Sequence, residues 1–133
     1  MKRLALLAAI LPFSCFAQND SWVLIARSTD AITEWSIQKG SFESITTKGG
    51  KPISVVVGRT TDKRTKEVDL AKWYVTDADC DRGLGTIVTL SVTGAFRFEN
   101  PFVKDSGSIA SSIADAICDV RGLQLKAREE KGI

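Results

Sequence analysis

The amino-acid sequence predicts an α+β domain, in which an antiparallel sheet of about six short strands carries one docked C-terminal helix. Between Trp22 and Val92 the apolar residues follow a period of two that turn residues interrupt, as is typical of short strands. From Ile109 onward the apolar spacing changes to that of one face of a helix. The length of 133 residues is typical of one domain.

The period-two segments are bounded by turn residues and differ in the burial that they predict. They lie at residues 22–27, 32–39, 41–46, 53–57, 68–75 and 86–92, followed by a brief alternation at 96–98. The run 53–57 is apolar except for one serine, which predicts a central strand. The apolar phase shifts by one between Ile32 and Trp35, which indicates a bulge or a late strand start. Asn100 and Pro101 predict the end of the last segment.

The C-terminal helix is predicted from a stripe of apolar residues with a cap at each end. The stripe consists of Ile109, Ile113, Ala116, Ile117 and Val120. Ser106 or Ser108 is the natural N-cap, and Gly122 is the predicted stop. Residues 123–133 are charged and predict a frayed extension. The large core side chains are expected to be Trp22, Trp35, Trp73, Phe42, Phe96 and Phe98.

The first residues have the organisation of a secretory signal peptide. A positively charged start, an apolar run and small residues precede a polar segment, so we predict a signal over residues 1–17. A bilayer span is the weaker interpretation, because the run is shorter than about 20 residues and Pro12 interrupts it. Lipoprotein processing at Cys15 is the alternative to cleavage after Ala17. The predicted location is the periplasm or the cell surface, with residues 18–122 as a single domain.

Composition and charge exclude several function classes. The chain has no histidine, which excludes the Ser-His-Asp triad, the Cys–His pair and the HExxH zinc helix. Removal of Lys2 and Arg3 with the signal lowers the basic side chains from 18 to 16, equal to the 16 acidic ones. A domain without net charge is a poor candidate for nucleic-acid binding. We predict neither an enzyme nor a resident cofactor.

Cleavage after Ala17 would leave two cysteines, Cys80 and Cys118. An even cysteine count in an oxidising compartment predicts one disulfide, and two buried free thiols are the alternative. The spacing is not that of a Cys-x-x-Cys redox motif, so the predicted role of the bond is structural.

A basic segment is the clearest candidate for a contact with a partner. It contains Arg59, Lys63, Arg64 and Lys66, with one acidic residue, Asp62, between them. Such a loop could bind an acidic surface or a polyanion. The other interpretation is the solvated tip of a hairpin.

Two sets of carboxylates are candidates for chemistry. Asp77, Asp79 and Asp81 alternate as in a calcium loop, but Arg82 and Val88 stand where that loop needs glycine and glutamate. The plainer interpretation is a polar turn in which the aspartates accept hydrogen bonds from the backbone. Paired acids on the strands are the other route to catalysis, and the candidates are Glu34, Glu43, Glu67 and Asp69.

The layout is similar to that of the surface-adhesin E family of small exported bacterial domains. The likeness rests on the strand that begins at Trp22, the strand Ile53–Val57, the Asp79-Cys80 pair, the Gly107-Ser108 step and the segment Ala116–Cys118. Ser106 stands where the family pattern has proline. The resemblance implies a six-stranded sheet with helical additions and the binding of host matrix and plasma proteins.

The predicted function is therefore that of an exported, non-catalytic module that binds another protein through a sheet face or a loop. The alternative is a periplasmic inhibitor or immunity protein that blocks an envelope or toxin enzyme. The two hypotheses share the size and architecture predicted here, and they differ in the identity of the partner.

Overall fold

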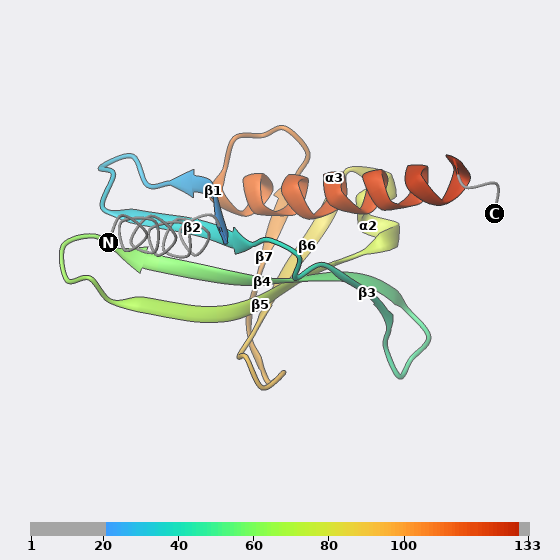
Figure 1. The fold of residues 1–133 in the computed structure, drawn as a ribbon, viewed down its shortest axis with the longest axis horizontal. Coiled ribbons are helices and arrows are strands. Elements are labelled where there is room, and N and C mark those ends of the chain that lie inside the picture. Colours follow the sequence, from blue (N-terminus) through green and yellow to red (C-terminus); the bar gives the residue numbers. More distant parts are fainter. Residues whose placement is uncertain (1–20, 131–133) are drawn as a thin grey trace, which may run out of the picture.

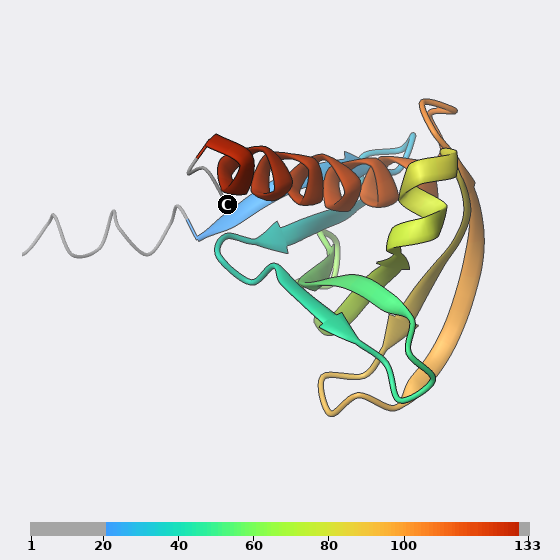
Figure 2. The same ribbon diagram turned by 90° about the vertical axis from the view of Figure 1, so that its right-hand side faces the viewer.

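The computed structural model describes residues 21–130. The predicted signal peptide with its cleavage site, the candidate lipidation site Cys15 and residues 131–133 lie outside the described residues. The described part is an antiparallel sheet with a long helix across one face, as Figures 1 and 2 show. The predicted α+β class is confirmed.

The described residues form seven strands and two helices. In chain order they are β1 (Trp22–Arg27), β2 (Thr33–Gln38), β3 (Glu43–Thr46), β4 (Pro52–Asp62), β5 (Val68–Thr76), α2 (Asp77–Arg82), β6 (Leu84–Leu90), β7 (Phe96–Val103) and α3 (Ile109–Glu130). The strand order is β1-β2-β4-β5-β6-β7, and β3 also pairs with β4. None of the helices between residues 21 and 130 is long and apolar enough to cross a membrane.

Strand β4 is the centre of the sheet, as its apolar run predicts. One of its edges pairs with two strands in succession: β3 lies against residues 52–55 and β2 against residues 58–62. The backbone N–H of Val57 lies between these two pairings and donates to the Ser41 hydroxyl at 2.9 Å. The link between β2 and β3 therefore satisfies a partly buried backbone donor that neither strand reaches.

The first strand pair contains a bulge. Leu24 lies opposite Ser36, but Ala26 lies opposite Trp35, so Ile25 is the extra residue of β1. Strand β2 begins at Thr33, which agrees with the late strand start among the two interpretations of the phase shift.

The last strand is longer than predicted. Strand β7 runs through Asn100 and Pro101 to Val103, so the predicted end at these residues was wrong. Proline is tolerated there because β7 pairs only with β6 among the described strands, and an edge strand has one side without ladder hydrogen bonds.

The core lies between the sheet and α3, on what we call the inner face of the sheet. Its buried cluster comprises Val56, Trp73, Val75, Ile87, Phe102, Ile113, Ala114 and Ile117. Trp35 and Phe42 pack against this cluster, as predicted. The three helix residues come from the predicted stripe or next to it, so α3 closes the core.

Two of the predicted core aromatics are exposed. Phe96 is 62% exposed and Phe98 is 49% exposed, and Phe102 lies in the core instead. For Phe96 the cause is a register shift: Phe98 pairs with Thr89 on the inner face, but Phe96 pairs with Leu90, so Arg97 is an extra residue in β7. This bulge turns Phe96 to the face of the sheet that points away from α3, which we call the outer face.

The start of α3 is fixed by serines. The Ser108 hydroxyl accepts the Ser111 N–H at 3.1 Å, and the Ser108 carbonyl accepts the Ser112 N–H at 2.9 Å. Ser108 is therefore the cap, one of the two predicted candidates. Ser111 is itself buried, and its hydroxyl accepts the Val103 N–H at 3.1 Å, which joins the helix start to the end of β7.

The helix was predicted to stop at Gly122, but it continues to Glu130. Residues 123–130 are therefore helical, and the prediction of a frayed extension was wrong for them. The residues that follow Gly122 are mostly strong helix formers, which outweigh one glycine that costs about 1 kcal/mol relative to alanine.

Gly122→Ala is expected to raise the free energy of unfolding by up to about 1 kcal/mol. Nothing lies within 4 Å of a Cβ placed at Gly122, so the methyl group has space, and alanine removes the conformational cost of glycine. Equilibrium unfolding in urea measures the change. Gly50→Ala is the control: it also has open space, but its φ of +87° disfavours alanine, so this variant should lose stability. A loss of stability in Gly122→Ala would contradict the helical assignment at this position.

The predicted disulfide is present and joins the two helices. Cys80 on α2 and Cys118 on α3 are bonded, with their Cα atoms 5.5 Å apart. Arg121 on α3 adds a second link, because its guanidinium lies 3.3 Å from Asp77 Oδ2 and 2.9 Å from Asp81 Oδ1. The turn-rich crossing that the sequence predicts between β5 and β6 thus contains a short helix fastened to α3.

Candidate binding site

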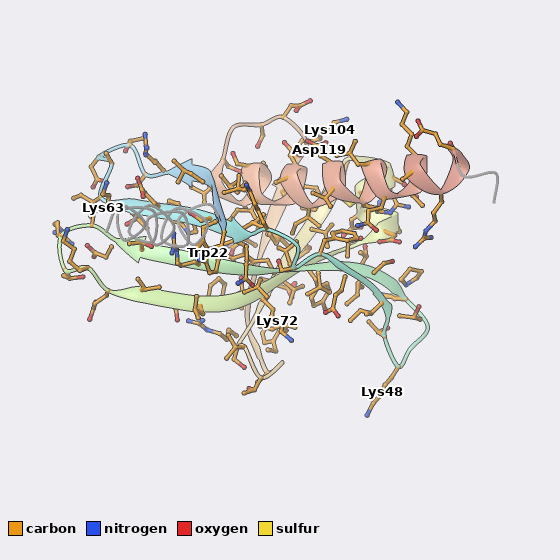
Figure 3. All side chains as sticks on the ribbon, viewed as in Figure 1. Trp22, Lys48, Lys63, Lys72, Lys104 and Asp119 are labelled. Atoms are coloured by element: carbon orange, nitrogen blue, oxygen red, sulfur yellow. A yellow bond between two sulfur atoms is a disulfide. The ribbon has the colours of Figure 1, made fainter. Side chains whose placement is uncertain are left out.

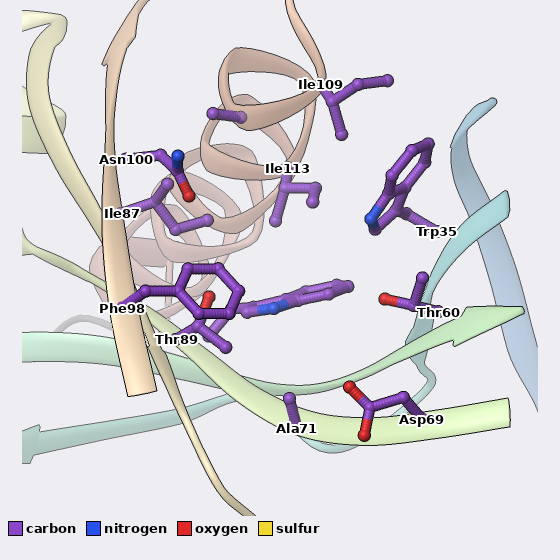
Figure 4. Close-up of a pocket in the computed structure, with 12 residues that line it drawn as sticks. Trp35, Thr60, Asp69, Ala71, Ile87, Thr89, Phe98, Asn100, Ile109 and Ile113 are labelled. Carbon is purple, nitrogen blue, oxygen red and sulfur yellow. The ribbon is translucent and has the colours of Figure 1, made fainter. Parts of the chain in front are cut away.

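A cavity of about 330 Å³ opens between the inner face of the sheet and the first turns of α3 (Figure 4). We call it the aromatic cavity. Its aromatic lining is Trp35, Trp73 and Phe98, its polar lining is Thr60, Asp69, Thr89 and Asn100, and its aliphatic lining is Ala71, Ile87, Ile109, Ala110 and Ile113. In Figure 4, Trp35 and Phe98 stand on opposite sides of the opening, with Ile109 and Ile113 toward the helix and Thr60 and Asp69 toward the sheet.

The register of the sheet brings this lining together. Two rows of cross-strand neighbours supply it: Trp35, Thr60 and Asp69 from β2, β4 and β5, and Trp73, Thr89 and Phe98 from β5, β6 and β7. Residues directly opposite each other on paired strands project to the same face of a sheet. Five strands therefore present one side chain or more each to a single cavity.

Trp73 is held against the backbone of β4 by a glycine. The tryptophan is only 4% exposed, and a Cβ placed at Gly58 would overlap its six-membered ring. Gly58 lies opposite Ala71, two residues before Trp73, so two small residues make room for the indole. This close approach is the reason for a glycine inside a central strand.

The polar lining carries unused hydrogen-bonding capacity. Over residues 21–130, the side chains of Thr60, Thr89 and Asn100 form no hydrogen bond to the protein. The Asp69 carboxylate accepts a hydrogen bond from Arg97 Nη1 at 3.0 Å. The cavity thus places uncommitted donors and acceptors beside aromatic rings, with its one charged lining residue already paired.

The sequence patterns do not predict this cavity. They place Trp35, Trp73 and Phe98 in the core and Asn100 at the end of a strand. Asn100 alternates with Phe98 and Phe102 in the sequence, so recognising that β7 continues would have placed it on the inner face. The two rows of cross-strand neighbours line one cavity only because of the strand order, which the sequence does not define.

Arg59 does not belong to the predicted basic loop. It lies within β4, opposite Ser36 and Leu70, and its guanidinium carbon is 4.4 Å from the centroid of the Trp22 ring. This is a cation–π contact on the outer face of the sheet. Trp22, predicted as a core residue, therefore packs on the opposite side from the core cluster.

The other three basic residues do lie in the turn between β4 and β5. Lys63 Nζ is 3.7 Å from the Glu34 carboxylate, and Arg64 Nη2 is 3.6 Å from the carboxylate of Asp62. Lys66 has a positive φ of 67°. The loop is thus partly neutralised by its own neighbours.

The outer face of the sheet carries exposed apolar side chains among polar ones. Leu24, Ser36, Arg59 and Leu70 form a row of cross-strand neighbours on it. Leu24 is 43% exposed and Leu70 is 45% exposed, and Phe96 lies on the same face because of the bulge in β7. Figure 3 shows Lys72 on this side of the sheet, opposite α3.

Three of the four candidate acids lie on strands, and Glu67 lies in the turn between β4 and β5. Glu34 binds Arg27 at 2.9 Å and Lys63, Asp69 binds Arg97, and Glu67 contacts the Thr65 hydroxyl. The hydrogen bond from Arg27 holds the pKa of Glu34 below its usual value. A general acid needs a raised pKa, so the direction at Glu34 is opposite to the one that this role needs.

The three alternating aspartates bind separate partners. Asp77 accepts the buried Ser54 hydroxyl at 2.9 Å, Asp79 accepts the Thr86 N–H at 3.2 Å and contacts Arg82, and Asp81 binds Arg121. Gly85 leaves the space that the Asp79 carboxylate fills. In the described part of the chain, no group of three acidic, cysteine or histidine side chains could hold a metal ion.

Comparison of the chain with protein-family models, with curated proteins and with solved structures gives no match. The similarity to the surface-adhesin E family therefore stays a prediction from the sequence. The described residues offer two candidate binding surfaces, the aromatic cavity and the outer face of the sheet.

Proposed function

We propose that this protein is an exported, non-catalytic module that binds another protein through the outer face of its sheet. The observation that carries the proposal is the pattern of exposure on the sheet: α3 packs against the inner face, whereas the outer face exposes Leu24, Leu70 and Phe96. Contiguous apolar patches on a soluble domain are typical of interaction sites.

The outer face also indicates the chemistry of the partner. Trp22 and Arg59 are residue types that are enriched at interaction hot spots, and here they are stacked on each other. Lys72 lies between the exposed apolar residues and makes no ion pair with any residue from 21 to 130. The partner is expected to offer apolar side chains flanked by carboxylates, which complement these cations.

Export is the second part of the proposal. It is supported by the charged, apolar and small-residue order of positions 1–17. The Cys80–Cys118 bond is compatible with an oxidising compartment, where such bonds persist. The adhesin-like class enters the proposal as the kind of exported binder that the sequence resembles.

Site-specific photo-crosslinking tests the proposal in cells that export the full chain. A photoreactive phenylalanine analogue replaces Leu70 or Phe96 on the outer face, and Asp119 on α3 is the control position. The expected result is an adduct to one other protein from the two outer positions and none from Asp119. A host-matrix protein as the captured partner identifies an adhesin, and an envelope or toxin enzyme identifies an inhibitor.

Charge reversal makes the same experiment specific. Lys72→Glu is expected to abolish the adduct, and Lys104→Glu, a change of the same charge near α3, is expected to leave it intact (Figure 3). An adduct that survives Lys72→Glu, an adduct to a second copy of this chain, or no adduct from either outer position would overturn the proposal.

A further inference from the structure

We infer that the aromatic cavity is a second binding site, and that its ligand is a neutral saccharide. This site lies on the inner face of the sheet and is independent of the outer face that carries the proposed protein contact. The inference rests on the charge of the cavity, on its free hydrogen-bonding groups and on its aromatic walls.

The charge of the cavity selects a neutral ligand. Asp69 is the one charged residue in the lining, and its carboxylate is already held by Arg97 at 3.0 Å. An anion would meet this carboxylate, and Arg97, which contacts the lining residues Asp69 and Phe98, is already paired with it. A cation would have to displace Arg97 from Asp69.

The unpaired polar side chains select a ligand with many hydroxyl groups. Thr60, Thr89 and Asn100 come from three different strands and have no hydrogen-bond partner in the described protein. A purely apolar ligand would remove them from water and leave them unpaired, which is unfavourable. Sugar hydroxyls both donate and accept, so they match threonine hydroxyls, the asparagine amide and the Asp69–Arg97 pair together.

The aromatic walls select a ring with an apolar face. Trp35 and Phe98 face the opening from opposite sides (Figure 4). Trp73 lines the same cavity from β5, which lies between β2 and β7 in the strand order. The C–H face of a pyranose can lie against an indole while its equatorial hydroxyls point outward. The volume of about 330 Å³ is near the lower limit for ligand sites, so we expect one sugar ring of a chain to enter.

An NMR titration of the purified, ¹⁵N-labelled protein tests this site, because the three tryptophans give separate indole N–H signals. The probes are chitotriose, maltotriose and β-1,4-galactotriose, with choline and a heparin tetrasaccharide as the cationic and anionic comparisons. We expect saturable shifts of the Trp35 and Trp73 signals, with Trp22 unmoved, for at least one neutral trisaccharide. Shifts with choline or heparin alone, or none at the two cavity tryptophans, would overturn the inference.

Two mild variants separate binding from folding. Thr60→Val keeps the shape of the side chain but removes the hydroxyl that would bond to the sugar. Asn100→Ala removes the side-chain amide on the edge strand β7. Each is expected to weaken binding of the active trisaccharide about tenfold, with the unfolding transition preserved. Lys72→Glu should leave sugar binding unchanged, which distinguishes this site from the proposed protein contact. Equal affinity of the wild-type protein and both cavity variants would contradict the assignment.

Discussion

Loss of the Cys80–Cys118 bond is expected to lower the free energy of unfolding by about 4 kcal/mol. The bond closes a loop of 38 residues, and without it the unfolded chain gains the conformational freedom of that loop. The native state also loses the covalent link between α2 and α3, the helix that closes the core. This change is large for a domain whose total stability is on the order of 5–15 kcal/mol.

The measurement is guanidinium unfolding of the oxidised protein and of the double variant in which alanine replaces both cysteines. Wild-type protein treated with a reductant is the matched control, since it loses the bond but keeps both side chains. Its midpoint should shift in the same direction as that of the variant. Equal midpoints for the oxidised and reduced protein would show that the bond does not contribute to stability.

Gly58→Ala is expected to destabilise the domain by about 1–3 kcal/mol, although it adds a single methyl group. The added Cβ would overlap the Trp73 ring, which is buried and cannot rotate away without disturbing the core cluster. Displacement of this ring would also deform the aromatic cavity, so we expect the Trp73 indole signal to move in the free protein.

Gly49→Ala provides the comparison for this variant. The nearest atom to a Cβ at Gly49 is the Thr47 hydroxyl oxygen at 3.9 Å, an ordinary contact. The free energy of unfolding of Gly49→Ala in urea should therefore stay within about 0.5 kcal/mol of the wild-type value, as for most surface changes. Similar midpoints for both variants would contradict the packing of Trp73 on β4.

The parts of the fold that depend on local patterns could be predicted from the sequence. The change of apolar period separates the sheet from α3, the apolar run identifies β4 as central, and an even cysteine count predicts the bond. Ser108 caps the helix, as expected for a serine that directly precedes a helical stripe of apolar residues. These signals lie within short segments, so the local sequence is sufficient to recognise them.

The parts that depend on position in the sheet could not be predicted. Whether Pro101 ends a strand depends on whether that strand is at an edge, and edges are defined only by the pairing of all strands. The bulge at Arg97 places Phe96 on the opposite face from Phe98 and has no signal in composition. The aromatic cavity needs both rows in register, so its residues look like core residues when each strand is considered alone.

The order of the chain gives α3 a consequence for the timing of folding. Its residues Ile113, Ala114 and Ile117 fill the core, and Cys118 completes the bond to a segment made much earlier. A strand-only intermediate would leave the inner surface uncovered and both sulfurs reduced. The closed core and the disulfide can therefore form only after residue 118 has been synthesised.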